Sequence, residues 1–233
     1  MFNVFKKKNK QKSAVHFIHI GKCGGSSLGK AVESSDKLKE NFERINYTHV
    51  HKPKLEPNEQ YLICIRNPVS RALSAFNWRY HLVVDTEEQK DRFQGEKEIL
   101  EKYGTLERLA ESLYVDGALV QEVALELRKI HHLREDINFY LEDLFKTSNA
   151  NSFFAILEQK NLNSDIERYL GVKPPVPQRS HRSNTPEDKL NLSFQAIENL
   201  EKFFHKDYIC ITKLYEQGAI DLDKMIRLCS YSQ

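Results

Sequence analysis

Short apolar runs alternate with longer amphipathic stretches along most of this chain. The runs are rich in β-branched and aromatic residues, which predicts strands at residues 15–20, 45–51, 60–66 and 153–157. The longer stretches predict helices at residues 26–41, 68–82, 161–170 and 188–217, with a helical block at 87–146. Strands that alternate with helices are typical of a parallel sheet covered by helices, so we expect an α/β fold.

The first predicted strand ends in a glycine-rich turn that leads into a helix. Such a turn points backbone N–H groups at an anion bound on the helix N-terminus. A lysine adds positive charge and two serines add hydroxyl donors. The lysine precedes the glycine pair, whereas nucleotide-triphosphate loops place it after the last glycine. The turn therefore predicts a phosphate-like anion site that differs from an ordinary ATP or GTP loop. Its residues are Lys22, Cys23, Gly24, Gly25, Ser26 and Ser27.

The third predicted strand leads into a second candidate anion site. Arg66 stands at the carboxyl end of this strand, where open α/β sheets bind ligands. Asn67 is a favourable N-cap and Pro68 suits the first helical position. Ser70 and Ser74 are four residues apart and share a helix face. We therefore expect Arg66 and Ser74 to bind an anion separate from the one at the glycine-rich turn.

The two motifs, in this order and at this separation, resemble those of the sulfotransferases that use 3′-phosphoadenosine 5′-phosphosulfate (PAPS). The turn around Lys22 is similar to the family's 5′-phosphosulfate loop, and Arg66 with Ser74 is similar to its 3′-phosphate site. The resemblance is best over residues 15–80 and closest to the carbohydrate-type members. It implies a P-loop-like three-layer fold with a central, mainly parallel sheet flanked by helices. It also implies PAPS as donor and a hydroxyl of a polysaccharide or glycolipid as acceptor.

Sulfuryl transfer needs a cation at the leaving oxygen and a base for the acceptor proton. Lys22 is the expected cation, because its flexible ammonium can reach the leaving oxygen from the turn. His49 and His51 end the second predicted strand, and alternate residues of a strand share a face. The resemblance favours His51 as the general base, with His49 next. The alternative is that both are strand-end histidines without a catalytic role.

Three further groups of residues have open roles. The resemblance implies that the basic loop 171–187 closes over the donor and that Arg179 and Ser180 contact it; an exposed basic loop is the alternative. His131 and His132, in the helical block that forms the acceptor side, fit structural roles better than acceptor contacts. Trp78 and Tyr80 fit packing roles better than a sugar-binding platform.

Length and charge narrow the class of protein. The chain of 233 residues is long enough for one α/β domain, and its net charge of +2 argues against a dedicated nucleic-acid binder. Residues 1–82 hold 15 Lys and Arg against 6 Asp and Glu, which suits an anionic donor, but five of these lysines lie within residues 6–12. We therefore expect a basic tail at residues 1–13 and a single domain at residues 14–233.

No run of about 18 apolar residues occurs, and no apolar core of the signal-peptide type follows the basic tail. We therefore expect a cytoplasmic protein without a transmembrane segment, similar to soluble bacterial-type sulfotransferases. The tail is either solvated or makes weak peripheral contact with anionic lipid. The four cysteines and nine histidines show no metal-ligand spacing, so no metal is expected.

Two other functions stay open from the sequence. A P-loop kinase is the enzymatic alternative, although the order of glycine and lysine is wrong for it. The third predicted strand also ends in Arg66, where such a kinase has an aspartate for magnesium. A non-catalytic module that binds the nucleotide or a sulfated glycan is the alternative from another class.

Overall fold

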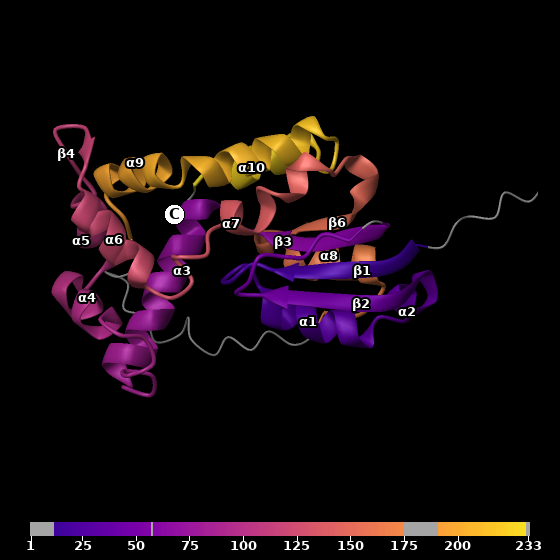
Figure 1. Cartoon of the computed structure of the whole chain (residues 1–233), viewed down its shortest axis with the longest axis horizontal. Helices are drawn as coiled ribbons and strands as arrows, with labels where there is room; N and C mark the ends of the chain where they lie inside the picture. Colours follow the sequence, from indigo (N-terminus) through magenta and orange to yellow (C-terminus); the bar gives the residue numbers. More distant parts are fainter. Residues whose placement is uncertain (1–11, 57, 175–190, 232–233) are drawn as a thin grey trace, which may run out of the picture.

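The computed structural model describes residues 12–56, 58–174 and 191–231. Its centre is a four-stranded parallel sheet in the order β2-β1-β3-β6 (Figure 1). The strands are β1 (Lys12–His19), β2 (Phe42–His49), β3 (Glu59–Ile65) and β6 (Phe153–Glu158). Helices flank this sheet, which confirms the predicted α/β fold.

Two groups of helices cover the sheet. The first packs α1 beside α8, and the second packs α10 against α7 and α11. Figure 1 shows α1 and α10 on opposite sides of the strands. These helices are α1 (Gly25–Ser34), α7 (Ile137–Leu141), α8 (Leu162–Leu170), α10 (His205–Glu216) and α11 (Leu222–Cys229). Single 3-10 turns connect the elements around β6: η2 (Leu144–Lys146), η3 (Ala150–Ser152) and η4 (Gln159–Asn161).

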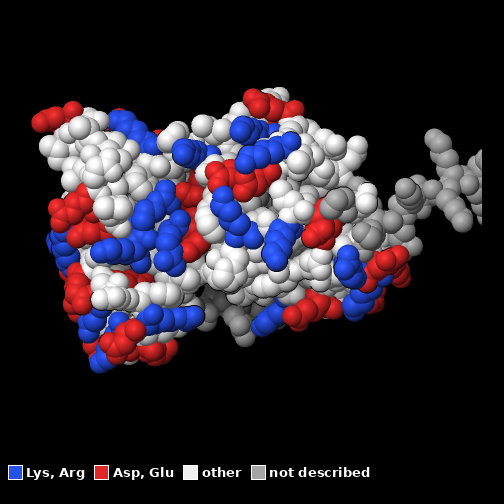
Figure 2. Space-filling model, viewed as in Figure 1, with Lys and Arg blue, Asp and Glu red and all other residues white. Residues whose placement is uncertain are grey.

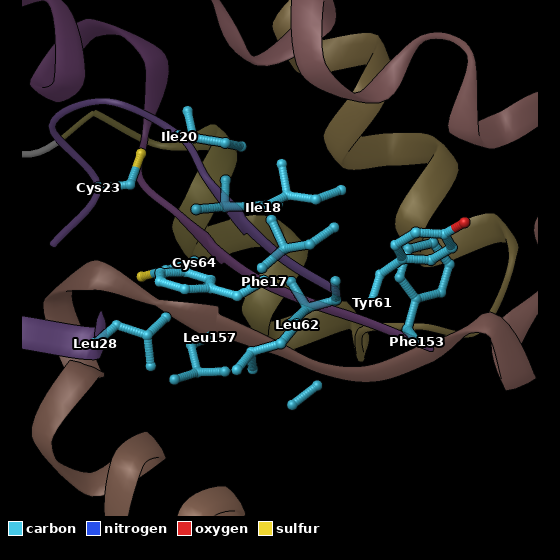
Figure 3. Close-up of a cluster of buried hydrophobic side chains, with 14 of the residues drawn as sticks. Phe17, Ile18, Ile20, Cys23, Leu28, Tyr61, Leu62, Cys64, Phe153 and Leu157 are labelled. Carbon is cyan, nitrogen blue, oxygen red and sulfur yellow. The ribbon is translucent and has the colours of Figure 1, made fainter. Parts of the chain in front are cut away.

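Strands β1, β3 and β6 are buried because helices lie on both faces, whereas the edge strand β2 is largely exposed after Phe42. Phe17, Ile18, Leu62 and Leu157 are all within 1% of complete burial, and they pack in one cluster with residues of both helical groups (Figure 3). Continuous apolar runs are the expected sequence pattern for such strands, since neither face meets water. This explains why the apolar runs located β1, β3 and β6 in the sequence.

A second apolar cluster lies in the helical part of the molecule, away from the sheet. Helix α3 runs from the sheet into this part, and α9 packs there on α5 (Figure 1). The elements are α3 (Pro68–Tyr80), the π-helical turn η1 (His81–Asp85), α4 (Glu96–Tyr103), α5 (Leu106–Glu111), β4 (Tyr114–Val115), β5 (Ala118–Leu119), α6 (Gln121–Lys129) and α9 (Phe194–Phe203). The predicted block is therefore mainly helical, but it contains a hairpin whose two-residue strands are too short to show a period.

Several predicted boundaries are shifted by a few residues, and two of the shifts have a clear local cause. The stretch expected as one helix at 26–41 forms α1 and α2 (Asp36–Asn41), because Ser35 leaves helical geometry and accepts a hydrogen bond from the Leu38 N–H as an N-cap. The strand expected to reach residue 51 ends at His49, because Val50 has a left-handed φ of 56°.

Charged side chains of both signs are interspersed over the face in Figure 2. Many form exposed pairs, such as those of Lys52 with Glu142 and of Lys102 with Glu126. Such pairs contribute little to stability individually. Within the described ranges, no helix has the length and apolar character needed to cross a membrane.

Candidate functional site

The carboxyl ends of β1 and β3 lie side by side in the middle of the sheet, with Ile18 paired to Ile63. The chain leaves β1 for β2 on one side and then returns to β3 on the other side of β1. This change of direction is a topological switch point, and open α/β sheets bind ligands in the crevice beside it. Both predicted anion-binding segments follow these two strands, so the fold brings them together.

The turn after β1 has the backbone geometry of an anion-binding loop. Lys22 and Gly24 have left-handed φ angles of 67° and 85°, and the Cys23 N–H donates to the Ile20 carbonyl oxygen at 3.3 Å. Helix α1 then begins at Gly25 without a hydrogen bond from a capping side chain. The first N–H groups of α1 are thus left to a ligand. A left-handed lysine is strained, and such strain is concentrated at functional sites.

Two glycines of this turn are required by close approach of histidine rings. A Cβ atom on Gly25 would lie 1.7 Å from the His19 ring, and one on Gly21 would lie 2.4 Å from Nδ1 of His132. Any larger residue would displace the turn or the ring. The turn is therefore packed between His19 and His132.

Cys23 anchors the turn in the core. Its side chain is fully buried in the cluster that contains Ile20 and Cys64 (Figure 3). Burial raises the pKa of the Cys23 thiol to about 11, so the thiol stays protonated at neutral pH. Because the sulfur of Cys23 is buried, only the backbone of this residue remains available for the contact with PAPS that the sequence predicted.

Lys22 lies between the two predicted sites. Its Nζ atom is 4.3 Å from the centroid of the Trp78 ring, and its carbonyl oxygen accepts a hydrogen bond from Nη1 of Arg66 at 3.4 Å. Burial, and then the positive charges of Arg66 and Arg79, lower the pKa of Lys22 to about 8. A polyanionic ligand would offset this concentration of positive charge.

The segment after β3 has the local structure that its sequence predicts. The Asn67 side chain accepts a hydrogen bond from the Ser70 N–H at 3.0 Å, and Pro68 occupies the first turn of α3. The Asn67 amide also donates to the Leu228 carbonyl oxygen, which ties this turn to α11. Ser70 and Ser74 are both half-buried on α3.

Three histidine rings from segments far apart in the sequence lie together beside the turn after β1. The rings of His19 and His49 stack with centroids 4.0 Å apart, and His132 lies 5.8 Å from His49. Nδ1 of His49 donates to the carbonyl oxygen of His19 at 3.0 Å, which leaves Nε2 as the acceptor of the neutral ring. Nδ1 of His19 is 2.6 Å from the hydroxyl of Tyr47.

The row of rings continues away from the turn. His131 lies 4.0 Å from His132 and 4.6 Å from Phe93. Burial lowers the pKa of His19 and of His131 to about 4, and it lowers the pKa of His132 further. These three rings are therefore neutral at physiological pH, and they add no positive charge of their own to the crevice.

His51 is placed differently from His49. The positive φ of Val50 ends the alternation of strand residues, so the argument that put both histidines on one face of a strand is wrong. His51 is exposed, and the neighbouring Lys52 forms ion pairs with Glu142 and Asp143. Of these two histidines, only His49 stacks on another ring among the ring contacts of the described residues.

Sequence reasoning missed His19 and Arg79, and it favoured structural roles for His131 and His132. His19 is the last residue of β1, directly before the turn, and this position was the available signal. Arg179 and Ser180 lie outside the described residues. Within the part of the chain that the structure describes, no group of three or more His, Cys, Asp or Glu side chains is arranged to hold a metal ion.

Comparisons of the chain with protein-family models, with curated proteins and with solved structures found no match. The functional conclusion is therefore drawn from the geometry of the crevice.

Proposed function

We propose that this protein is a sulfotransferase that moves the sulfuryl group of PAPS to a hydroxyl of a carbohydrate acceptor. The contact between Arg66 and the carbonyl oxygen of Lys22 carries the proposal. It joins two anion-binding segments at the switch point of a parallel sheet, where a donor with two phosphate-bearing ends can bind both.

The charges and donors of the crevice suit the two ends of PAPS. The uncapped N-terminus of α1, with Ser26 and Ser27, would bind the 5′-phosphosulfate. Arg66 and Ser74 would bind the 3′-phosphate, since a guanidinium forms paired hydrogen bonds with phosphate oxygens. P-loop kinases have an aspartate for magnesium at the end of the corresponding strand, whereas this chain has Arg66 at the end of β3. This difference favours a donor that needs no metal.

In the reaction, the acceptor oxygen attacks sulfur in line with the bond from sulfur to the bridging phosphate oxygen. The new S–O bond forms as the bridging bond breaks, and the 5′-phosphate leaves with the bonding electron pair. The Lys22 ammonium would stabilise the negative charge that develops on that oxygen. A base takes the proton of the acceptor hydroxyl.

The geometry favours His49 over His51 as this base. The hydrogen bond from Nδ1 of His49 to the His19 carbonyl fixes the tautomer and leaves Nε2 to accept a proton. The neutral rings of His19 and His132 lie next to His49, with centroids 4.0 Å and 5.8 Å from its own. His51 is less well placed to act as the base, because it is exposed and lies beyond the end of β2.

The decisive experiment is calorimetric titration with adenosine 3′,5′-bisphosphate (PAP), the product of the donor, in parallel with ATP. We expect PAP to bind without magnesium, and the Arg66→Ala variant to bind it at least tenfold more weakly. Arg44→Ala, which removes an exposed arginine of β2, is the matched control and should bind as the wild type does.

The alternatives give different outcomes in the same experiment. A preference for ATP with magnesium would favour the kinase. PAP binding without sulfate transfer from PAPS to any member of a broad glycan panel would favour a non-catalytic binding module. Binding of neither nucleotide would overturn the proposal.

A further inference from the structure

The ammonium of Lys22 rests on the face of the only tryptophan of the chain. The distance from Nζ to the centroid of the Trp78 ring is 4.3 Å, which is a close cation–π contact. The indole is half-buried, so part of its surface is accessible to solvent. This contact and the proposed reaction compete for the same ammonium, since one Nζ cannot cover the indole and also follow the leaving oxygen.

Trp78 stands on α3 in line with the candidate 3′-phosphate site. Ser70, Ser74 and Trp78 are spaced by four residues and therefore lie on one face of this helix. Ser74 would contact the 3′-phosphate, and Trp78 lies four residues, about 6 Å, further from Arg66 along the helix. In the proposed reaction, the contact with Lys22 would therefore put the indole at the end of the site where the sulfuryl group is transferred.

The chemistry at that end identifies the ring that the indole would bind. In PAPS the adenine is separated from the sulfuryl group by the ribose and the 5′-phosphate, so a group beside Lys22 faces the acceptor and not the base. An indole face is apolar with a negative quadrupole, and it packs well against the C–H face of a pyranose ring. Hydroxyl groups around the edge of such a ring remain available for the attack on sulfur.

The attractions on the Lys22 ammonium favour its movement from the indole to the donor when PAPS binds. A cation–π contact is weaker than a charge-assisted hydrogen bond to a phosphate oxygen. The nearby charges of Arg66 and Arg79 repel the ammonium, and the negative charges of a donor would reverse that repulsion. The long side chain of lysine can make this move without a change in the backbone.

We propose that Trp78 is the platform for a pyranose ring of the acceptor, and that Lys22 covers this platform until PAPS binds. The inference rests on the proposed function and deepens it, because it gives the reaction a compulsory order. The donor binds first and draws Lys22 away from the indole. The acceptor ring then packs on the uncovered face, where its hydroxyl lies next to the sulfuryl group.

Because Trp78 is the sole tryptophan, its fluorescence reports directly on whether Lys22 lies over the indole ring. We expect PAP at saturation to change the emission of the wild type and to raise the rate constant for quenching by acrylamide at least twofold. In the Lys22→Met variant, the free protein should already show the higher quenching constant, and saturating PAP should leave it unchanged. Lys30→Met, an exposed lysine of α1, is the matched control and should behave as the wild type does.

The outcomes separate the inference from the proposed function. If calorimetry shows PAP binding while acrylamide quenching of the wild type stays constant, Lys22 does not uncover Trp78 and the inference alone is overturned. If Lys22→Met shows the same rise in quenching as the wild type, the nucleotide itself causes the change, and the inference is again overturned. If PAP does not bind, the proposed function falls, and the inference with it.

The platform is tested with a glycan array probed in the presence of PAP. We expect the wild type to bind a set of glycans that the Trp78→Ala variant loses and the Trp78→Phe variant keeps, with PAP affinity within twofold in all three proteins. Trp78→Phe also guards against misfolding, because it retains an aromatic ring at this position. An array on which the wild type binds no glycan, or on which Trp78→Ala binds the same glycans, overturns the platform.

Discussion

Arg79 and Glu96 form a doubly hydrogen-bonded ion pair that is almost completely excluded from solvent. The distances are 2.9 Å from Nε to Oε1 and 2.7 Å from Nη2 to Oε2, and each side chain is 1% exposed. Glu96 also accepts a hydrogen bond from the backbone N–H of His131 at 2.8 Å. One carboxylate thus connects α3, α4 and the segment that carries the histidine pair of the crevice.

The first prediction concerns this carboxylate. Glu96→Gln should lower the free energy of unfolding by about 3–5 kcal/mol, because it leaves the guanidinium of Arg79 buried without its counter-charge. Chemical denaturation measures the effect, with the exposed Glu98→Gln on the same helix as control. A loss no greater than that of the control would show that the pair is not a principal connection between these helices.

The second prediction separates two glycines of α1. Gly25→Ala should abolish PAP binding and destabilise the fold, because its Cβ would overlap the His19 ring at 1.7 Å. In Gly29→Ala the nearest atom to the new Cβ lies 3.9 Å away, on Phe17, so this change should stabilise the helix by about 0.5–1 kcal/mol. Thermal unfolding and calorimetry of both variants check this contrast, and equal behaviour of the two would contradict it.

The third prediction uses the lowered pKa of Lys22. In the free protein the emission of Trp78 should titrate with a midpoint near pH 8, because loss of the proton there removes the cation from the indole. An ordinary lysine would titrate above pH 10. The Lys22→Met variant should lack this transition.

Other groups close to Lys22 titrate far from this midpoint, since the pKa of Cys23 is about 11 and that of His19 about 4. A transition near pH 8 that persists in Lys22→Met would therefore assign it to a different group and contradict the prediction.

The fourth prediction distinguishes the two candidate bases. His49→Ala should keep PAP affinity and lose about 10²–10⁴-fold in sulfate transfer, the usual contribution of a general base. His51→Ala should retain turnover, because His51 lies beyond the end of β2 and is exposed. Single-turnover assays with PAPS provide the measurement. The reverse pattern, with turnover lost in His51→Ala alone, would assign the base to His51.

Local patterns in the sequence were sufficient for much of the fold. The strand-like runs predicted all four strands of the parallel sheet, and Asn67 and Pro68 predicted the start of α3. These features depend on residues within one turn or one strand, so they can be recognised without knowing the partner segments. The break at Ser35 was missed, because its second hydrogen bond goes to the carbonyl oxygen of Leu170, far along the chain.

Some features of the candidate site were likewise evident from the sequence, and others were not. The sequence by itself determined the glycine-rich turn with Lys22, and the position of Arg66 at the end of a strand. Only the tertiary structure decided that His19, His49 and His132 form one row, and that Trp78 lies under the ammonium of Lys22. The physical reason is sequence separation: the sheet order and the packing of α3 set these contacts, and no local periodicity carries information about them.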